Sequence, residues 1–302
     1  MSWIFIAVLS HSLSGLAFLT DKFLVSKRSL APIAYAFYVS ILGLSVLVLI
    51  PFGFSIPGSD LILFSLLVGA SFLIGNFFFY KSLELGEVSR MAPLIGGFVP
   101  VFAFILSYIF LNNRLSLDQI IAFIVLIIGG MVIIWPSRKK ISNLEKLNLN
   151  KKLIIALVSA FFFGASFVAT KFIFNELSFI NGLIWTRLAT AFSALLLLFL
   201  PFIRRKIFQE SKEMKFSTSG ILVANKSLSA IGFILFNYAI FLGPVALVNA
   251  LQGVQYVFLL VFAVILSKKL PSFIKEQVNP STILQKVLGI FLIVFGLFLL
   301  VF

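Results

Sequence analysis

Three polar side chains recur on one face of a segment that is otherwise apolar. Asn249, Gln252 and Tyr256 lie at positions i, i+3 and i+7 between Leu242 and Leu260, and on a helix this spacing places them above one another. An unpaired amide in hydrocarbon is costly, so the face should meet water, a ligand or a polar neighbour. We interpret it as the lining of a cavity. Interhelical hydrogen bonds are the structural alternative.

A lysine in a second apolar segment has the chemistry to bind an anion. Lys226 lies well inside the helix predicted over 219–241, and Ser229 follows one turn later on the same side. An ionisable group at this depth indicates function by default, and a desolvated ammonium favours a carboxylate or a phosphate. Alternatively, the long stem of Lys226 carries its charge to the membrane interface.

Other polar groups lie within predicted helices. His11 is the only histidine, and Ser14 lies one turn away from it. A neutral packing role for His11 and contact with a ligand or proton are both open. Asn76 and Tyr80 are also one turn apart, and we expect them to face inward. For Arg187 we favour a structural pairing or a snorkelling role over ligand contact.

The acidic residues offer no carboxylate at mid-membrane depth. All ten, Asp21 among them, fall at predicted helix ends or in loops, so we expect no buried acid to neutralise Lys226. Proton-driven antiporters commonly use such a carboxylate, and coupling is therefore left open. With one histidine, no cysteine and no GxxxxGK[ST] motif, the sequence predicts no metal site, no cofactor, no ATP hydrolysis and no enzyme activity.

The composition is that of a membrane protein built from many helices. Of 302 residues, 61% are hydrophobic and 11% are charged, against about half and about a quarter in soluble domains. The segment before residue 20 lacks the basic start of a signal peptide and is expected to be a retained helix. The 38 Phe residues are interpreted as compositional bias rather than as an aromatic-lined site.

Apolar runs of about 20 residues predict transmembrane helices. The sequence predicts an all-α polytopic membrane protein with ten such helices, near 3–20, 31–50, 61–80, 91–111, 118–136, 153–173, 181–202, 219–241, 247–267 and 285–302.

Basic residues are concentrated on one side of this arrangement. Of the 24 Lys and Arg residues, 19 fall in the connections after predicted helices 1, 3, 5, 7 and 9, whereas the opposite side clearly holds only Arg114. The positive-inside rule places these connections in the cytoplasm and both termini outside. The net charge of +14 is then a topology signal and a contact with anionic lipid, and it does not indicate nucleic acid as a partner.

The two halves of the chain resemble each other. The segment from Ser10 matches the segment from Ser159 at a constant offset. The matching pairs are Ser10 with Ser159, Gly15 with Gly164, Phe18 with Phe167, Lys22 with Lys171 and Phe23 with Phe172. Because each half holds five helices, an odd number, the halves insert with opposite orientation. We expect two inverted five-helix repeats over 1–136 and 153–302, joined by a basic cytoplasmic linker over 137–152.

These halves resemble a known family. The segments "FFFYKSLELGEVSRMAPLIGGFVPVFAFILSYIFLNNRL" and "FNYAIFLGPVALVNALQGVQYVFLLVFAVILSKKLP", with "LIWTRLATA" around Arg187, are similar to EamA-type members of the drug/metabolite transporter superfamily. The resemblance implies a central cavity lined by predicted helices 1, 3, 4, 6, 8 and 9, with helices 5 and 10 as scaffold. It also implies export of amino acids or related metabolites. The chain departs from the family at Asn112–Leu115 and Lys268–Pro271, where a Gly-Glu pair is common.

Two functions follow from these observations. The first is a transporter in a bacterial or archaeal cytoplasmic membrane, a monomer or homodimer, exporting or exchanging small carboxylate-bearing solutes by alternating access. Its expected substrate-binding residues are His11, Ser14, Asn76, Tyr80, Lys226, Ser229, Asn249, Gln252 and Tyr256. The alternative is a lipid-handling or accessory protein that binds a phospholipid-like head group at Lys226. A groove that opens sideways favours the lipid function, and a closed pocket favours transport.

Overall fold

The computed structural model describes most of the chain. The described residues are 2–27, 30–111, 117–134, 143–213, 216–243, 245–269 and 279–301. Arg114, Asn112–Leu115 and the first part of the predicted linker lie outside these ranges. The described part is helical, with no strand in it.

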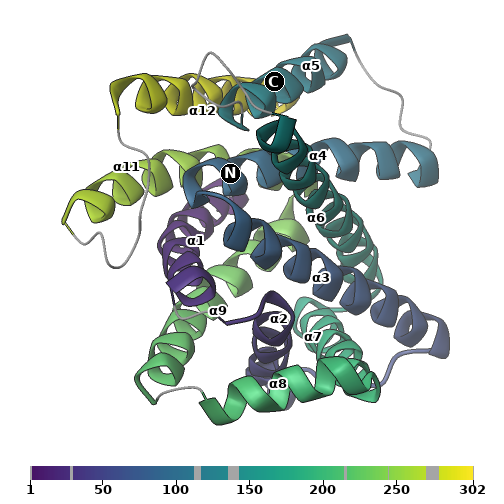
Figure 1. The fold of residues 1–302 in the computed structure, drawn as a ribbon. Helices are drawn as coiled ribbons and strands as arrows, with labels where there is room; N and C mark the ends of the chain where they lie inside the picture. Colours follow the sequence, from purple (N-terminus) through teal and green to yellow (C-terminus); the bar gives the residue numbers. More distant parts are fainter. Residues whose placement is uncertain are drawn as a thin grey trace.

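Figure 1 shows how the helices are arranged. In the first half they are α1 (Ser2–Lys27), α2 (Pro32–Leu42), the 3₁₀ helix η1 (Gly43–Phe52), α3 (Ser59–Leu85), α4 (Val88–Leu111) and α5 (Leu117–Ile134). In the second half they are α6 (Asn143–Glu176), α7 (Phe179–Leu196), the short 3₁₀ helix η2 (Leu197–Phe199), α8 (Pro201–Glu213), α9 (Phe216–Leu242), α10 (Val245–Ala250), α11 (Gly253–Lys269) and α12 (Pro280–Val301).

Seven helical segments in the described ranges are long and apolar enough to cross a membrane. They are Trp3–Val25, Pro32–Phe52, Ser59–Leu85, Val88–Leu106, Asn148–Glu176, Phe179–Phe199 and Phe216–Leu242. Two shorter apolar helices, Ile120–Ile133 and Pro280–Gly296, accompany them. For the described residues, the prediction of an all-helical chain with helices that can cross a membrane is thereby confirmed.

Local sequence accounts for several helix boundaries. Pro32 occupies the start of α2, where its missing N–H is no loss. Gly53 ends η1 with a φ of 150°, a backbone conformation that favours glycine. Ser178 precedes α7, and its hydroxyl accepts a hydrogen bond from the backbone N–H of Asn181 at 3.4 Å.

The two halves of the chain pack into each other rather than side by side. The first helix of each half packs along the third helix of the other, so that α1 lies against α9 and α6 lies against α3. The last helices, α5 and α12, pack together at one end of the molecule (Figure 1). Buried residues of both halves join in one large core cluster, which includes Leu83, Met91 and Leu259.

Three features differ from the sequence-based prediction. The segment after the seventh predicted helix, expected to be a loop, contains α8. The ninth predicted helix, 247–267, is divided, because α10 ends at Ala250 and α11 begins at Gly253. The last part of the predicted linker is helical, since α6 begins at Asn143.

Helix α8 lies across the ends of α2 and α7, at the opposite end of the molecule from α5 and α12 (Figure 1). Its apolar side packs on the start of α2, where Ile203 and Ile207 join Ala31 and Ala34 in a small core cluster. The Glu210 carboxylate accepts the backbone N–H of Ala31 at 2.9 Å and 3.0 Å. A carboxylate in this position compensates the positive end of the α2 dipole.

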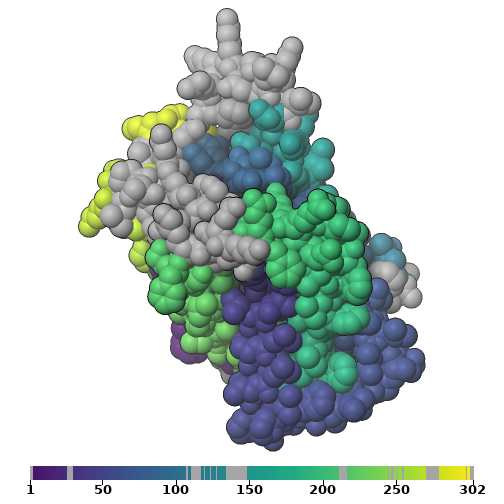
Figure 2. Space-filling view, turned by 60° about the horizontal axis from the view of Figure 1, so that its bottom comes forward, coloured from purple at the N-terminus to yellow at the C-terminus, as the bar shows by residue number. Residues whose placement is uncertain are grey.

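One face of the molecule is formed by α2 and η1. Figure 2 shows them as a purple strip beside α7 and α8 in green. Large apolar side chains on this strip are exposed, among them Val48 and Phe52 at 73% and 70%. This is the surface expected of a helix that meets lipid on one side.

Candidate functional site

A cavity of about 520 Å³ lies between the two halves of the chain. Helices α1, α3 and α4 of the first half line it together with α6, α9 and the α10–α11 pair of the second, as the family resemblance implies. The α2–η1 strip and α7 complete the wall, and the resemblance did not imply these two. Its volume lies within the range of about 300–1,000 Å³ that is typical of small-molecule sites.

Phenylalanine dominates the wall. Seven of these side chains line the cavity: Phe18, Phe72, Phe79, Phe163, Phe167, Phe233 and Phe236. They touch one another in edge-to-face and stacked pairs, such as Phe163 on Phe167 with ring centroids 5.9 Å apart. An aromatic-lined site, which the sequence analysis set aside in favour of compositional bias, is therefore present at this cluster.

Eight of the nine residues expected to bind substrate line this cavity. They are His11, Ser14, Asn76, Tyr80, Lys226, Ser229, Asn249 and Gln252. Tyr256 does not line it. Contact with a solute stays a prediction for all of them.

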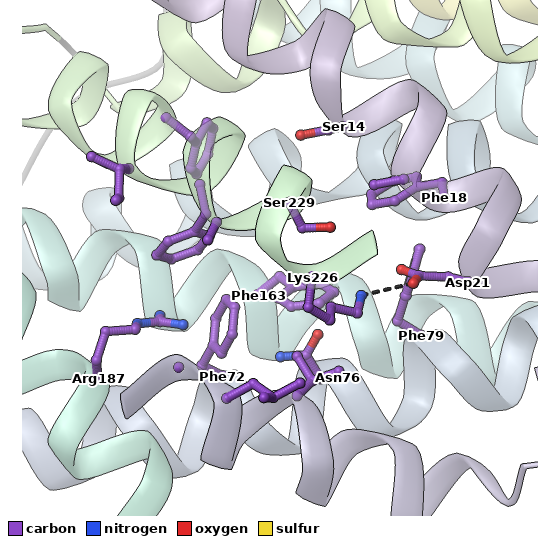
Figure 3. Close-up of a pocket in the computed structure, with 18 of the residues that line it drawn as sticks. Ser14, Phe18, Asp21, Phe72, Asn76, Phe79, Phe163, Arg187, Lys226 and Ser229 are labelled. Atoms are coloured by element: carbon purple, nitrogen blue, oxygen red, sulfur yellow. Dashed lines mark hydrogen bonds and ion pairs between the residues drawn. The ribbon is translucent and has the colours of Figure 1, made fainter. Parts of the chain in front are cut away.

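The expectation that no buried acid meets Lys226 was wrong. Asp21 on α1 is buried, and its Oδ1 lies 2.7 Å from Nζ of Lys226 on α9 (Figure 3). The two side chains are only 3% and 10% exposed. The error came from the helix boundary, because α1 continues to Lys27 and Asp21 therefore lies within the helix.

The Asp21 carboxylate is held by further donors. The same oxygen accepts the hydroxyl of Tyr35 at 2.6 Å and the side-chain amide of Asn225 at 2.6 Å. Nζ of Lys226 also lies 3.5 Å from the hydroxyl of Tyr80. A buried ion pair is stable only when such additional hydrogen bonds accompany it. This cluster connects α1, α2, α3 and α9.

Arg187, for which we favoured a structural or snorkelling role, lines the cavity from α7. Its guanidinium carbon lies 4.3 Å from the ring centroid of Phe72 and 4.0 Å from that of Phe233. These cation–π contacts hold the group without cancelling its charge. Its Nε is buried and has no hydrogen-bond partner in the described part of the chain.

Figure 3 shows how the charges are distributed. Arg187 lies on one side of the cavity, and the Asp21–Lys226 pair lies on the other, with Phe72, Phe163 and Asn76 between them. The amide nitrogen of Asn76 is buried and makes no hydrogen bond to a described residue. It is therefore a donor available to a bound solute.

His11 and the serines are partly occupied by the protein itself. Nε2 of His11 lies 3.0 Å from the carbonyl of Val248, so this nitrogen is the donor, and the ring meets Phe236 edge-on. Ser14 donates to the carbonyl of Ser10, and Ser229 to that of Asn225. The oxygens of both serines retain lone pairs that can accept a hydrogen bond.

The break between α10 and α11 changes which side chains reach the cavity. Leu251 and Gln252 form a turn there, in which the N–H of Gln252 donates to the carbonyl of Asn249 at 3.0 Å. After the turn Gln255 lines the cavity in place of Tyr256. Gln255 lies beside His11, but neither of its amide atoms makes a hydrogen bond of ordinary geometry to a described residue.

Tyr256 is buried in the core instead. Its hydroxyl has no partner among the described residues and lies directly against Gly96 of α4. A side chain at position 96 would collide with it. Tyr256 thus packs α11 on α4. The side-chain oxygen of Gln252 reaches the same glycine, so the two residues share one face although Tyr256 does not line the cavity.

Metal ligands do not cluster in the described residues. They contain no group of three or more His, Asp or Glu side chains that could hold a metal ion. What the cavity offers is a set of recognition groups, namely one ion pair, one further cation, free amide donors and aromatic surfaces.

Comparison with known proteins adds a family and a fold. A protein of Archaeoglobus fulgidus described as an uncharacterized transporter is 34% identical over 139 residues, which are 45% of this chain and 48% of that protein. The chain is therefore matched to about half the length of this curated relative. A solved crystal structure of another protein covers 99% of this chain and 94% of its own, with a TM-score of 0.59 at 15% identity, which shows a shared fold. Residues 1–135 match the EamA-like transporter family, so the resemblance to this family that the sequence predicted is confirmed over this part of the chain.

Proposed function

We propose that the protein is a secondary transporter rather than an enzyme, and that it moves small organic metabolites across a bacterial or archaeal cytoplasmic membrane. Amino acids and related carboxylate-bearing solutes are the substrate class, and export or exchange is the direction. The central cavity carries this proposal, because both halves of the chain contribute charged and amide groups to it in a protein that is 61% hydrophobic. Ionisable groups inside a membrane commonly mark a substrate pathway.

The architecture proposed for this function is ten transmembrane helices in two inverted repeats, 1–136 and 153–302. The broken pair α10 and α11 then forms the ninth span, and α8 lies outside the count. The reciprocal packing of α1 on α9 and of α6 on α3 supports this division. Inverted repeats allow one half to rock against the other around a fixed site.

The Asp21–Lys226 pair has a direct role in such a movement. It joins α1 of the first repeat to α9 of the second at 2.7 Å. Rocking of the repeats changes the distance between these helices, so the pair is made in one state and stretched in another. A buried pair that is present in only one of the two states biases the equilibrium between them.

The proposed orientation has both termini outside. Helix α8 then lies at the cytoplasmic surface, where its exposed Arg204, Arg205 and Lys206 meet anionic lipid head groups. The exposed rings of Phe202 and Phe208 on the same helix suit the boundary between head groups and hydrocarbon.

Reconstitution tests the transport proposal. The purified protein is placed in liposomes, and uptake and efflux of a labelled panel of amino acids, carboxylates, neutral amides and amines are measured. Saturable movement of carboxylate-bearing solutes, absent from empty liposomes, is the expected result. A panel in which no solute moves faster than in empty liposomes contradicts the proposal.

A lipid-handling function is the second candidate, and one observation favours it. Val48 lines the cavity and is also 73% exposed, so the cavity reaches the outer surface of the bundle beside η1. The same liposomes, prepared with a fluorescent phospholipid, separate the two functions. Accelerated exchange of the phospholipid between leaflets, without solute transport, supports the lipid function.

A further inference from the structure

We infer that Arg187, and not Lys226, binds the anionic group of the solute, and that the preferred solute carries one net negative charge on an apolar body. This inference rests on the transport function proposed above. It assigns a role to a residue for which the sequence suggested only a structural one. It also narrows the substrate class from carboxylate-bearing solutes in general to those with a net charge of minus one, so zwitterionic amino acids are no longer the preferred solutes.

Lys226 is not free to bind an anion. Its ammonium already meets the Asp21 carboxylate at 2.7 Å, and Tyr35 on α2 and Asn225 on α9 also hold that carboxylate. An incoming carboxylate would have to displace Asp21 and leave a buried charge without its partner. The pair is better suited to contact a neutral polar part of the solute.

Arg187 has the opposite surroundings. No carboxylate in the described residues pairs with it. Its guanidinium instead lies against the rings of Phe72 and Phe233. The two rings meet edge-to-face, with centroids 5.6 Å apart, and the guanidinium occupies the angle between them. Aromatic rings attract a cation but cannot accept its N–H groups as a carboxylate does. The planar guanidinium of Arg187 is therefore held in place while its N–H groups remain available to a hydrogen-bond acceptor.

The charges of the cavity wall define the net charge of the best ligand. Among the described residues that line the cavity, the ones with a carboxylate, ammonium or guanidinium group are Asp21, Lys226 and Arg187. Asp21 and Lys226 cancel, which leaves one positive charge. In a site whose wall includes seven phenylalanines, a singly charged anion balances this charge, whereas a zwitterion does not.

The space between the charges defines the rest of the ligand. Phe72 and Phe163 separate Arg187 from the Asp21–Lys226 pair (Figure 3), so an aromatic or branched apolar body fits beside the anionic group. Asn76 lies in the same space with a free amide donor. It suits an oxygen acceptor near the carboxylate, as in an aromatic or branched-chain 2-oxo acid or 2-hydroxy acid.

Ligand-induced thermal stabilisation of the purified protein tests the assignment independently of transport. The probes share one apolar body: phenyllactate, its neutral amide, the zwitterion phenylalanine and the cation phenethylamine. We expect the wild-type protein to bind phenyllactate most tightly. Arg187→Gln should weaken phenyllactate binding about tenfold or more, the loss expected for a charge-assisted bidentate contact, and change binding of the amide little. Arg205→Gln on exposed α8 is the matched control.

Arg187→Lys is a second variant, which keeps the assignment testable if Arg187→Gln does not fold. It retains the charge but loses the planar fork, so partial retention of phenyllactate binding is expected in monodisperse protein. Unchanged phenyllactate affinity in a folded Arg187→Gln or Arg187→Lys variant overturns the assignment. Tighter wild-type binding of phenylalanine or phenethylamine overturns the charge preference. Solute uptake by wild-type liposomes under either outcome leaves the transport function standing, whereas absence of any uptake contradicts transport itself.

Discussion

Lys22 and Lys171 make the same contact in opposite halves of the chain. Nζ of Lys22 donates to the carbonyls of Leu83 and Gly86 at the end of α3, at 2.5 Å and 2.6 Å. Nζ of Lys171 donates to the carbonyls of Ile240 and Phe241 at the end of α9, at 3.0 Å and 3.1 Å. In each case a lysine on the first helix of a half satisfies the free carbonyls of that half's third helix.

The two lysines are also a matching pair in the sequence comparison of the halves. A chance likeness of sequence would not be expected to reproduce a specific contact between a side chain and a helix terminus. The shared contact therefore supports the proposed repeats from an observation that is independent of the charge pattern.

The first prediction concerns these two lysines. Lys22→Met and Lys171→Met should each destabilise the protein by a similar amount, about 1.5–3 kcal/mol, the value for hydrogen bonds to a charged group. Thermal unfolding in detergent measures the effect, and Lys151→Met, which changes an exposed lysine at the start of a span, is the control. Midpoints equal to that of the control would show that the contacts are not maintained in solution.

The second prediction concerns the ion pair in the cavity. Asp21→Asn and Lys226→Met should each lower stability strongly, by about 3–5 kcal/mol, because each leaves one buried charge unpaired. The double variant should recover part of the loss, and a double-mutant cycle should give a coupling free energy of about 1–3 kcal/mol. Additive effects of the two substitutions would argue against a pair that forms in solution.

The third prediction concerns Gln252, which the sequence placed on one helix face with Tyr256. Gln252→Leu should abolish transport in liposomes while leaving expression and monodispersity nearly unchanged, because Gln252 lines the cavity. Loss of folded protein instead would indicate that its amide forms an interhelical bond.

The fourth prediction concerns Tyr256, which has a buried hydroxyl without a partner. Tyr256→Phe should leave transport intact and raise the stability by about 1 kcal/mol, since the desolvated hydroxyl is removed. Gly96→Ala should destabilise by about 1–3 kcal/mol through overpacking, and less so when combined with Tyr256→Phe. A Tyr256→Phe variant that folds normally but no longer transports would return this residue to the binding site.

The fifth prediction concerns topology. The chain contains no cysteine, so single cysteines at positions 2 and 205 can be labelled without background. With both termini outside, position 2 should react with an impermeant thiol reagent from the outer side, and position 205 on α8 only from the cytoplasmic side. The reverse pattern would invert the proposed orientation.

Long apolar runs were sufficient to place most helices, because a membrane span must be long and apolar regardless of its partners. The same criterion missed α8, whose basic residues Arg204, Arg205 and Lys206 indicated a connection. The signal was present as Ile203 and Ile207, four residues apart and both buried against α2. It is the pattern of a helix that lies along a surface.

The site was predicted in part for similar reasons. Polar residues in apolar segments are costly unless they face a cavity or a partner, and most of the residues selected on that basis do line the cavity. Asp21 was missed because it lies close to a predicted helix end, where an acid normally meets water. Tyr256 lies with Gln252 against Gly96 but is fully buried. Helical spacing therefore predicted the side of the helix on which it lies, but not whether it reaches the cavity.

The 3₁₀ geometry of η1 gives the cavity wall an unusual regularity. With three residues per turn, side chains three positions apart lie directly above one another instead of spiralling around the axis. Gly43, Val46 and Leu49 form one such column, Ser45 and Val48 form a second, and all five line the cavity. The side chains of η1 therefore line the cavity at regular intervals along its depth. Changing the size of one of them widens or narrows the cavity at that depth and leaves the other depths unchanged.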